Sequence, residues 1–300
     1  MAGPVNKADS PSVQELTKVR FTNLDRMMFP ANHITKGDVI AYYIRIAPRM
    51  LPFLSGRPLT MHRFPEGVDS EAFYEKDAPR GTPDFVDIFT RYSETADRDV
   101  HFIVCNNLDT LIWLANLASL EIHTTLAKAA TYDTPDLLLF DIDPEPPLTF
   151  DDVIDVALIL RENLEQGGIR SYVKTSGKKG LHIVIPLFQG YRYNEVREFV
   201  HSIGKTIARE TAHVVSEFPH SRDPGTIFID YLQNAQGKTM AAPYSLRATP
   251  GATVSMPLRW DELKQGVRSE DFNIMTALSR DEDPWRDIND NRQEIRNQNR

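Results

Sequence analysis

Hydrophobic residues recur along the chain at the spacings of both helices and strands. Apolar positions three and four apart predict helices, whereas short apolar runs bounded by Pro, Gly or Asp predict strands. The expected helices are a segment that opens at Thr35, a buried helix over 108–121, and helices over 149–166 and 194–209. The expected strands are 137–143, 171–175, 181–187 and 226–232. This mixture favours an α+β or mixed α/β fold over a purely parallel sheet.

Local signals indicate where some of these elements begin and turn. Thr35 is followed three residues later by Asp38, which is typical of a capping box at a helix start. Gly167 and Gly168 end the helix expected before them. The sequence SGKKG at 176–180 separates two apolar strands and predicts a tight hairpin.

The 300 residues contain no Gly/Ser linker and no internal repeat, so we expect one catalytic domain over 15–288. Residues 1–14 are polar and aperiodic and are expected to form a flexible lead. Residues 289–300 are polar and rich in amides, and are expected to form a tail.

The charge of the chain is unevenly distributed. Its 34 basic and 42 acidic residues give a net charge of −8, which argues against a protein that coats polyanions. One segment, 133–155, holds acidic side chains equal in number to the whole net charge and no basic ones. They are Asp133, Asp136, Asp141, Asp143, Glu145, Asp151, Asp152 and Asp155. Local patches for nucleic acid therefore stay possible elsewhere, and the acidic segment favours metal binding.

Cysteine content and hydropathy narrow the class of protein further. The single cysteine, Cys105, excludes an internal disulfide framework and a cysteine-built zinc site, and its apolar surroundings predict a core residue. No apolar run has the length of about 20 residues that spans a bilayer. The N-terminus lacks a signal-peptide pattern, so we expect a cytoplasmic protein without membrane partners.

Asp141 and Asp143 end the strand expected over 137–143. Alternate residues of a strand share a face, so these carboxylates would lie side by side while the apolar residues between them face the core. Two carboxylates at this spacing repel each other unless a cation lies between them, and their oxygens suit Mg²⁺ or Mn²⁺. The alternative is a solvated strand end.

Two further elements carry polar groups next to apolar strands. Asp230 lies among apolar residues of the strand 226–232, where it could pair with an arginine or join the first two carboxylates around divalent ions. In the hairpin, Ser176 and the backbone N–H groups could bind an anionic oxygen beside Lys178 or Lys179. An ordinary basic hairpin is the alternative, and His182 could equally be a satisfied strand histidine.

The order of these elements, DID, then SGKKGLH, then an aspartate in a later strand, resembles the three-motif order of the archaeo-eukaryotic primase superfamily. Flanking segments narrow the likeness, namely NLDRMMFP, TKGDVIAYY, HRFPEGVDSEAFYEKDAP and IDYLQNAQGKTMAAPYSLRATPGATVSMPLRWDEL. They resemble the polymerase domain of bacterial ligase D, which acts in non-homologous end joining. The resemblance covers residues 15–288.

The resemblance implies a primase-polymerase catalytic core, in which an RNA-recognition-like sheet carries the site beside a second sheet layer. Asp141, Asp143 and Asp230 would be catalytic residues that hold two Mn²⁺ or Mg²⁺ ions. Residues expected to bind the NTP or dNTP are Ser176, Lys179, His182, Arg247, Gln233 and His123. Members of the family favour ribonucleotides.

The resemblance also implies two contacts with DNA. Arg26 and Lys36 match basic positions that bind the 5′-phosphate on the downstream side of a gap; otherwise they would be solvated surface charges. Phe73 and Tyr74 match an aromatic pair that stacks on template bases; otherwise they would be core residues.

The implied function is a DNA-repair nucleotidyltransferase that extends primers and fills short gaps at double-strand breaks by two-metal phosphoryl transfer. Its DNA substrates would have gaps or 3′ overhangs and a 5′-phosphate. The ligase signature Lys-x-Asp-Gly is absent, so a separate DNA ligase and a Ku-type protein are expected to act in trans. A de novo primase and a mainly structural end-bridging module are the alternatives.

Overall fold

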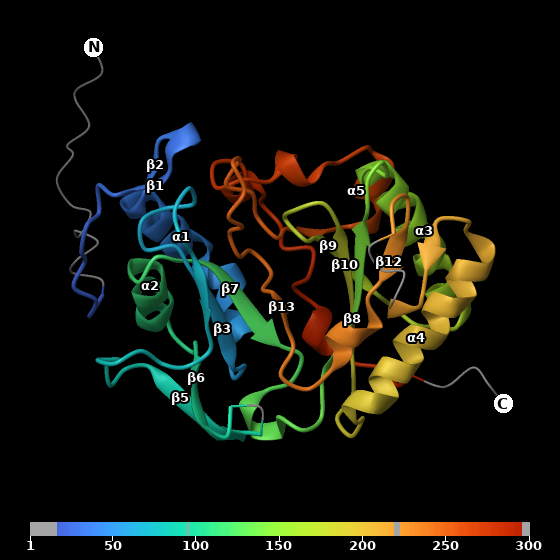
Figure 1. Cartoon of the computed structure of the whole chain (residues 1–300), viewed down its shortest axis with the longest axis horizontal. Coiled ribbons are helices and arrows are strands. Elements are labelled where there is room, and N and C mark those ends of the chain that lie inside the picture. The colour runs from blue at the N-terminus through green and yellow to red at the C-terminus, as the bar shows by residue number, and fades with distance from the viewer. Residues whose placement is uncertain (1–16, 95, 219–222, 296–300) are drawn as a thin grey trace, which may run out of the picture.

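The computed structural model describes residues 17–94, 96–218 and 223–295. Two β-sheets lie next to each other, and helices α1 and α2 flank one while α3 and α4 flank the other (Figure 1). The first sheet is formed mainly by the N-terminal half of the chain and the second by residues from 137 onward. The mixed α/β prediction is therefore confirmed.

The larger sheet has the chain order β-α-β-β-α-β of a ferredoxin-like unit. Its elements are β8 (Leu137–Pro144), α3 (Phe150–Gln166), β9 (Tyr172–Thr175), β10 (Leu181–Pro186), α4 (Tyr193–Glu210) and β12 (Ile227–Ile229). The four strands lie in the order β12-β8-β10-β9, and all of these pairs are antiparallel. Two short strands, β11 (Val214–Val215) and β14 (Pro257–Leu258), extend the sheet at its edges. This arrangement confirms the expected RNA-recognition-like sheet and the predicted hairpin.

The smaller sheet has the order β13-β7-β3-β4. Its strands are β13 (Thr239–Ala241), β7 (Ser119–Thr125), β3 (Leu59–Arg63) and β4 (Phe73–Glu75), and the helices beside it are α1 (Lys36–Leu54) and α2 (Leu108–Asn116). The expected capping box is formed, since the Thr35 side chain accepts from the Asp38 amide and Asp38 accepts from Thr35. Tyr43 of α1 donates to the Leu120 carbonyl at 2.6 Å and joins the helix to β7.

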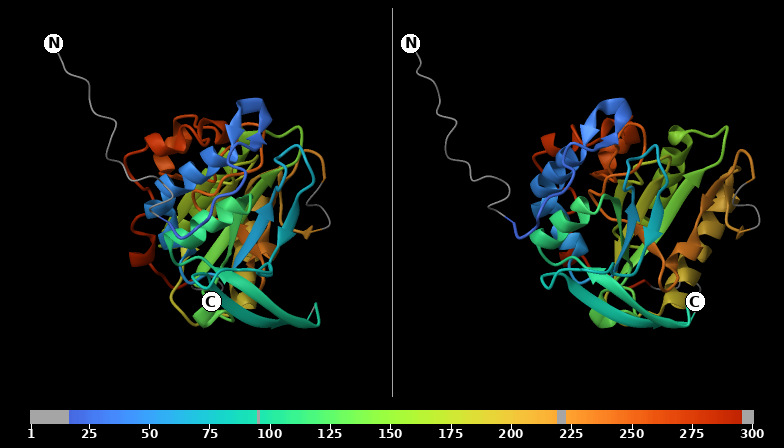
Figure 2. Two further views of the ribbon diagram at one scale, coloured as in Figure 1. Left: turned by 90° about the vertical axis from the view of Figure 1, so that its left-hand side faces the viewer. Right: turned by 60° about the vertical axis from the view of Figure 1, so that its left-hand side comes forward.

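Smaller elements surround these two sheets. They are the ribbons β1 (Met27–Phe29) with β2 (Ile34–Thr35) and β5 (Asp87–Ser93) with β6 (Arg98–Val104), and the short helix α5 (Trp260–Lys264). The β5–β6 ribbon projects from the lower side of the molecule (Figure 2).

The helix expected over 108–121 is wrong in its second half. Helix α2 ends at Asn116, Ala118 takes a left-handed conformation with φ of 57°, and the chain continues as β7. The sequence shows no Gly or Pro at this break, so the apolar periodicity of the helix continues into a fully buried strand without a stop signal.

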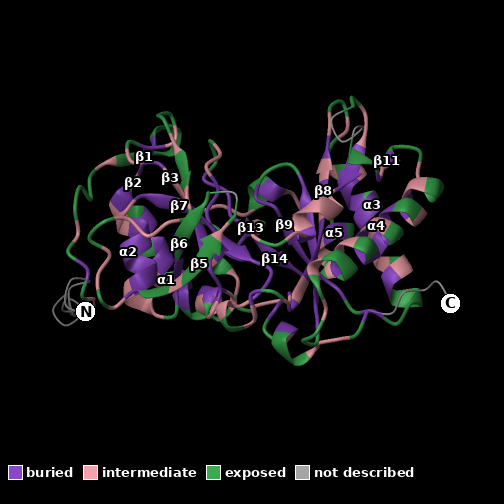
Figure 3. Ribbon diagram, turned by 60° about the horizontal axis from the view of Figure 1, so that its bottom comes forward, coloured by how far each residue is buried: buried purple, intermediate pink, exposed green. Residues whose placement is uncertain are grey.

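Hydrophobic residues of both sheets join in one large buried cluster, which runs from Val19 to Ile295. Figure 3 shows buried positions along the central strands and exposed positions on the outer faces of the helices. Cys105 is fully buried in this cluster, as expected. Residues 289–295, part of the predicted polar tail, lie against the larger sheet, where Gln293 donates to the Pro186 carbonyl. The rest of that segment and the predicted lead up to residue 14 lie outside the described residues.

In the described residues, 17–94, 96–218 and 223–295, none of the helices combines the length and the apolar character that a membrane crossing requires.

Candidate active site

Asp141 and Asp143 project from the face of β8 that lies away from the core. Leu138, Phe140 and Ile142 are fully buried, whereas the two aspartates are partly exposed. The alternation follows from the strand geometry that the sequence predicts. The two carboxylates therefore occupy the same side of the sheet, next to the strand end at Pro144.

Asp230 reaches the same place from β12. This strand pairs with the end of β8, so that Phe228 lies opposite Asp143, and the Asp230 amide donates to the Asp141 carbonyl at 2.9 Å. The Asp230 side chain caps the short helix that follows by accepting from the Leu232 amide at 2.8 Å. All three aspartates line one cavity of about 140 Å³, together with Glu145, Phe218, Phe228 and Gln233.

The three carboxylates repel one another. Burial raises the pKa of Asp141 to about 6. Burial, followed by the charge of Asp141, raises the pKa of Asp143 to about 6 and also raises the pKa of Asp230. A nearby cation would favour the ionised form of each of these carboxyl groups, because its charge is opposite to theirs.

The donor set fits a hard divalent cation, although no closed cage is formed. The Oδ1 atom of Asp141 is buried and has no hydrogen-bond partner among the described residues. Among the described residues, no group of three or more His, Cys, Asp or Glu side chains is already arranged to hold a metal ion. Carboxylate oxygens with spare coordination capacity are the ligands that Mg²⁺ and Mn²⁺ prefer, and Mg²⁺ keeps several waters or substrate oxygens.

His182 lies beside Asp141 on the neighbouring strand β10. The two residues are cross-strand partners, and His182 Nε2 lies 3.2 Å from Asp141 Oδ1. Burial, with the charges of Lys174 and Arg247, lowers the pKa of His182 well below its usual value, so the ring is neutral at physiological pH. Lys174 is completely buried on β9 and donates to Ser255. The sequence reading did not single out this lysine, because its neighbours look like an ordinary strand.

The hairpin between β9 and β10 folds tightly against the aspartates. Ser176 Oγ accepts hydrogen bonds from the Lys178 and Gly180 amides at 3.2 and 3.1 Å. A Cβ atom on Gly180 would lie 2.2 Å from Asp143 Oδ1, and one on Gly177 would lie 2.5 Å from the Arg247 side chain. Both glycines are therefore needed for close approach of the turn to the site.

All six predicted nucleotide-binding residues meet in a second, larger cavity of about 360 Å³. It opens between the two sheets and shares Asp141, Asp143 and Gln233 with the smaller cavity. The predicted residues that line it are Ser176, Lys179, His182, Arg247, Gln233 and His123, and Tyr74 and Lys178 line it too. The residues that the sequence predicted from separate segments thus line two adjoining cavities.

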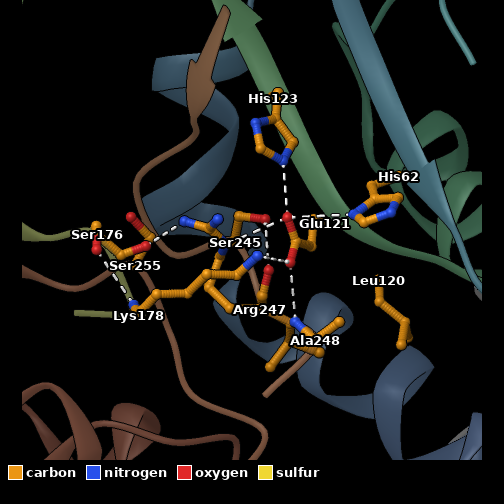
Figure 4. A network of polar contacts seen from close by, with 12 residues as sticks. His62, Leu120, Glu121, His123, Ser176, Lys178, Ser245, Arg247, Ala248 and Ser255 are labelled. Carbon is orange, nitrogen blue, oxygen red and sulfur yellow. Dashed lines mark hydrogen bonds and ion pairs between the residues drawn. The ribbon is translucent and has the colours of Figure 1, made fainter. Parts of the chain in front are cut away.

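A buried carboxylate, Glu121, lies behind this cavity and was missed by the sequence reading. His62, His123, Lys178 and Arg247 surround it in Figure 4. The Glu121–His123 pair lies at alternate positions of β7, which places both side chains on one face. Because the expected helix ran to residue 121, this alternation was not recognised.

The aromatic pair expected to stack on template bases is exposed and not part of the core. Phe73 is 43% exposed and Tyr74 is 60% exposed. The ring of Tyr74 stacks on His62 with centroids 3.9 Å apart, and the Arg63 guanidinium lies over Phe73. The core-packing alternative is therefore wrong, and an exposed ring at the cavity edge is compatible with stacking on a base.

The two cations expected at a DNA 5′-phosphate have different surroundings. Lys36 is only 4% exposed, and its Nζ donates to the Thr22 carbonyl at 2.7 Å. Arg26 is partly exposed and pairs with Glu66 at 2.6 Å. Burial, then the charges of Arg26 and Arg63, lowers the pKa of Lys36 to about 8. Lys36 is thus not a solvated surface charge, and it lies close enough to Arg26 to feel its field.

The protein-family model described as the LigD primase-polymerase domain matches residues 35–285 of this chain. The chain belongs to this family. The matched range includes the three aspartates, the 176–180 hairpin and Arg247. The resemblance to the polymerase domain of bacterial ligase D, inferred from the motif order and the flanking segments, is therefore confirmed.

Relatives with curated names agree with this assignment. The bifunctional non-homologous end joining protein LigD of Bacillus subtilis is 35% identical over 88% of this chain, and the multifunctional protein of the same name from Pseudomonas aeruginosa is 30% identical over 92%. The chain spans only 42% and 34% of the lengths of these two relatives.

A solved structure extends the likeness to three dimensions. It is described as the polymerase domain from Mycobacterium tuberculosis ligase D in complex with DNA. It matches with a TM-score of 0.83 and 27% identity, and covers 92% of this chain and 99% of the matched chain. The LigD-type fold is therefore present almost in full.

Proposed function

We propose that this chain is a DNA-repair nucleotidyltransferase that extends primers and fills short gaps at broken DNA ends. The observation that carries the proposal is that three aspartates from two strands share a cavity, which is continuous with a larger one lined by cationic and hydroxyl side chains. Membership of the LigD primase-polymerase family supports it.

Asp141, Asp143 and Asp230 would hold two divalent ions, Mn²⁺ or Mg²⁺. When bound, such ions activate a hydroxyl nucleophile and neutralise the charge of a triphosphate and its leaving group. The aspartates contribute a fixed cluster of negative charge at the end of β8. Partial burial lowers the local dielectric constant and so strengthens the attraction between these carboxylates and the cations.

The remaining residues would bind and orient the nucleotide. Lys179 and Arg247 supply positive charge to the triphosphate, and Ser176 together with the turn amides supplies hydrogen-bond donors. Neutral His182 lines the same cavity beside Asp141 and would contact the triphosphate. Gln233 and His123 line the same cavity and would contact the nucleotide, and we expect ribonucleotides to be preferred.

Primer extension on a gapped duplex tests the proposal, with NTPs and dNTPs compared in Mg²⁺ and in Mn²⁺. Metal-dependent filling of the gap, faster with NTPs, is the expected result. Absence of nucleotide addition under every condition would refute the proposed function. Efficient synthesis on unprimed single strands would instead favour a de novo primase.

Arg26 and Lys36 would bind the downstream 5′-phosphate of a gap. Because the pKa of Lys36 is lowered to about 8, its ammonium is charged below that pH and loses its proton above it. The phosphate stays dianionic throughout this range, since its second pKa is about 6. The affinity gained from a 5′-phosphate is therefore expected to fall as the pH rises from 7 to 9.5.

Fluorescence anisotropy with phosphorylated and unphosphorylated gaps at constant salt measures this gain. In Lys36→Arg the guanidinium stays charged, so the gain should persist to pH 9.5. In Lys36→Met the gain should be reduced at pH 7 and should change little with pH, so that it approaches the wild-type gain at pH 9.5. A gain that does not change with pH in the wild-type protein would exclude Lys36 as the phosphate ligand.

A further inference from the structure

The proposed nucleotide pocket has a buried anion at its back, and the inference below rests on that proposed function. The Glu121 side chain has no exposed surface, and its Oε1 accepts from the Ala248 amide at 3.0 Å. Four basic side chains lie around its carboxylate (Figure 4). The distances are 2.9 Å to His123 Nε2, 3.3 Å to Arg247 Nε, 3.4 Å to Lys178 Nζ and 3.5 Å to His62 Nδ1. Burial opposes ionisation of Glu121, but the polar contacts with His123 and His62 and the charge of Arg247 outweigh it and hold the pKa of Glu121 far below its usual value, so the group is ionised.

Glu121 fixes one edge of the Arg247 guanidinium. Nε faces the carboxylate, while Nη1 donates to the Ser176 carbonyl in the turn. Nε is buried and lies 3.3 Å from Glu121 Oε2 as an ion pair, without a hydrogen-bond partner among the described residues. A guanidinium held on two sides presents its remaining N–H groups in one direction only, and Arg247 lines the pocket.

Glu121 also sets the proton on His123. A carboxylate only accepts hydrogen bonds, so Nε2 of His123 must carry the proton that bonds to Oε2. Burial lowers the pKa of His123, so the ring is neutral and its Nδ1 is left as an acceptor. The ring lines the pocket and is oriented by its carboxylate partner, as in many histidine sites.

Lys178 differs from these two because it is only loosely held. Its side chain is 43% exposed, yet its Nζ lies 3.4 Å from Glu121 Oε1. It therefore extends along the pocket wall toward the buried carboxylate. A triphosphate entering the pocket would carry more negative charge than Glu121 and would compete for this ammonium.

We propose that Glu121 is a positioning residue for the incoming nucleotide: it orients Arg247 and His123 toward the pocket and yields Lys178 to the triphosphate. Glu121 would touch neither the nucleotide nor the reacting atoms. Its effect on nucleotide binding would pass through the two side chains that it holds.

Two physical effects of removing this charge have opposite signs, which makes the proposal testable. Glu121→Gln removes a negative charge near the phosphate-binding cations, and electrostatics alone would tighten the binding of a triphosphate. Loss of orientation would weaken it instead, because Arg247 and His123 would lose their common partner. The proposal predicts that orientation outweighs charge.

Steady-state primer extension with Glu121→Gln should show a KM for the nucleotide raised about tenfold or more, with kcat within about threefold of the wild-type value. The increase in KM should be non-additive with the increase caused by Arg247→Lys, because both changes break the same contact. An unchanged or lowered KM, or strict additivity, would overturn the proposal.

Asp136→Asn is the matched control. Asp136 is also a buried carboxylate, paired with Arg57 at 2.7 Å, but it lies at the opposite end of β8 from Asp141. The Asp136→Asn variant should have a lower melting temperature and an unchanged KM. A KM raised equally by this control would overturn the proposal. If Glu121→Gln does not fold, Glu121→Asp keeps the charge but cannot reach both partners, and it should raise the KM in the same way.

Primer extension distinguishes failure of the proposed function from failure of the role of Glu121. A wild-type protein that adds no nucleotide would overturn the proposed function and, with it, the role of Glu121. Normal wild-type extension with an unchanged KM in the Glu121 variants would overturn the role of Glu121 alone.

Discussion

Asp141→Asn is expected to reduce nucleotide addition by at least about 10³-fold, equal to roughly 4 kcal/mol of transition-state free energy. Asp141 contributes to the electrostatics of both other carboxylates, and its buried Oδ1 has no hydrogen-bond partner among the described residues. The amide removes the charge that would bind a divalent ion but keeps the shape of the side chain. Primer extension measures the loss, and binding of gapped DNA should change little.

The same variant should have a higher melting temperature than the wild-type protein in buffer without divalent ions. Because burial raises the pKa of Asp141 to about 6, ionisation of this group costs folding free energy. The cost is complete above about pH 6 and disappears as the pH falls toward 4, where the carboxyl is protonated in both states. Differential scanning fluorimetry at pH 7.5 measures it. A wild-type rate of extension or a large drop in melting temperature would contradict the role given to Asp141.

Gly180→Ala is expected to reduce activity by about 10²-fold and to lower the free energy of unfolding by about 1–3 kcal/mol. The added Cβ would lie 2.2 Å from both Asp143 Oδ1 and the Ile142 carbonyl. The carbonyl belongs to the central strand β8 and cannot move cheaply, so the hairpin or the Asp143 side chain must shift. Primer extension and urea denaturation measure the two effects.

Gly204→Ala is the matched control for this change. Gly204 lies inside α4, and the nearest atoms to its added Cβ are 3.8 Å away. Alanine is the better helix former, so this variant should keep its activity and gain up to about 1 kcal/mol of stability. Full activity in Gly180→Ala would show that the turn does not press against Asp143.

Much of the fold and of the candidate active site could be predicted from the sequence. The alternation that ends in Asp141 and Asp143 is a property of one strand, and the glycine-flanked turn at 176–180 is a property of one hairpin. Both are local, so composition and spacing are sufficient to place them. The pairing of β12 with β8, which brings in Asp230, was not predicted. The residues alone left Asp230 either paired with an arginine or joined to the other two carboxylates, and the family resemblance implied the second.

What the sequence could not provide depends on tertiary contacts. The break of the helix at Ala118 has no local stop signal, and this hid the strand that carries Glu121. The burial of Lys36 results from its bond to Thr22, 14 residues earlier, which no periodicity reveals. Glu121 collects its partners from β3, β7, the hairpin and the loop after β13, so its role emerges only when the two sheets meet.

We propose that Asp141, Asp143 and Asp230 together form one site for divalent ions. Anomalous scattering from crystals grown with Mn²⁺ and a non-hydrolysable NTP tests it most directly. Strong peaks are expected between these carboxylates in the wild-type protein, and they should be lost in Asp141→Asn. Peaks located elsewhere, or a site whose occupancy does not depend on Asp141, would contradict it.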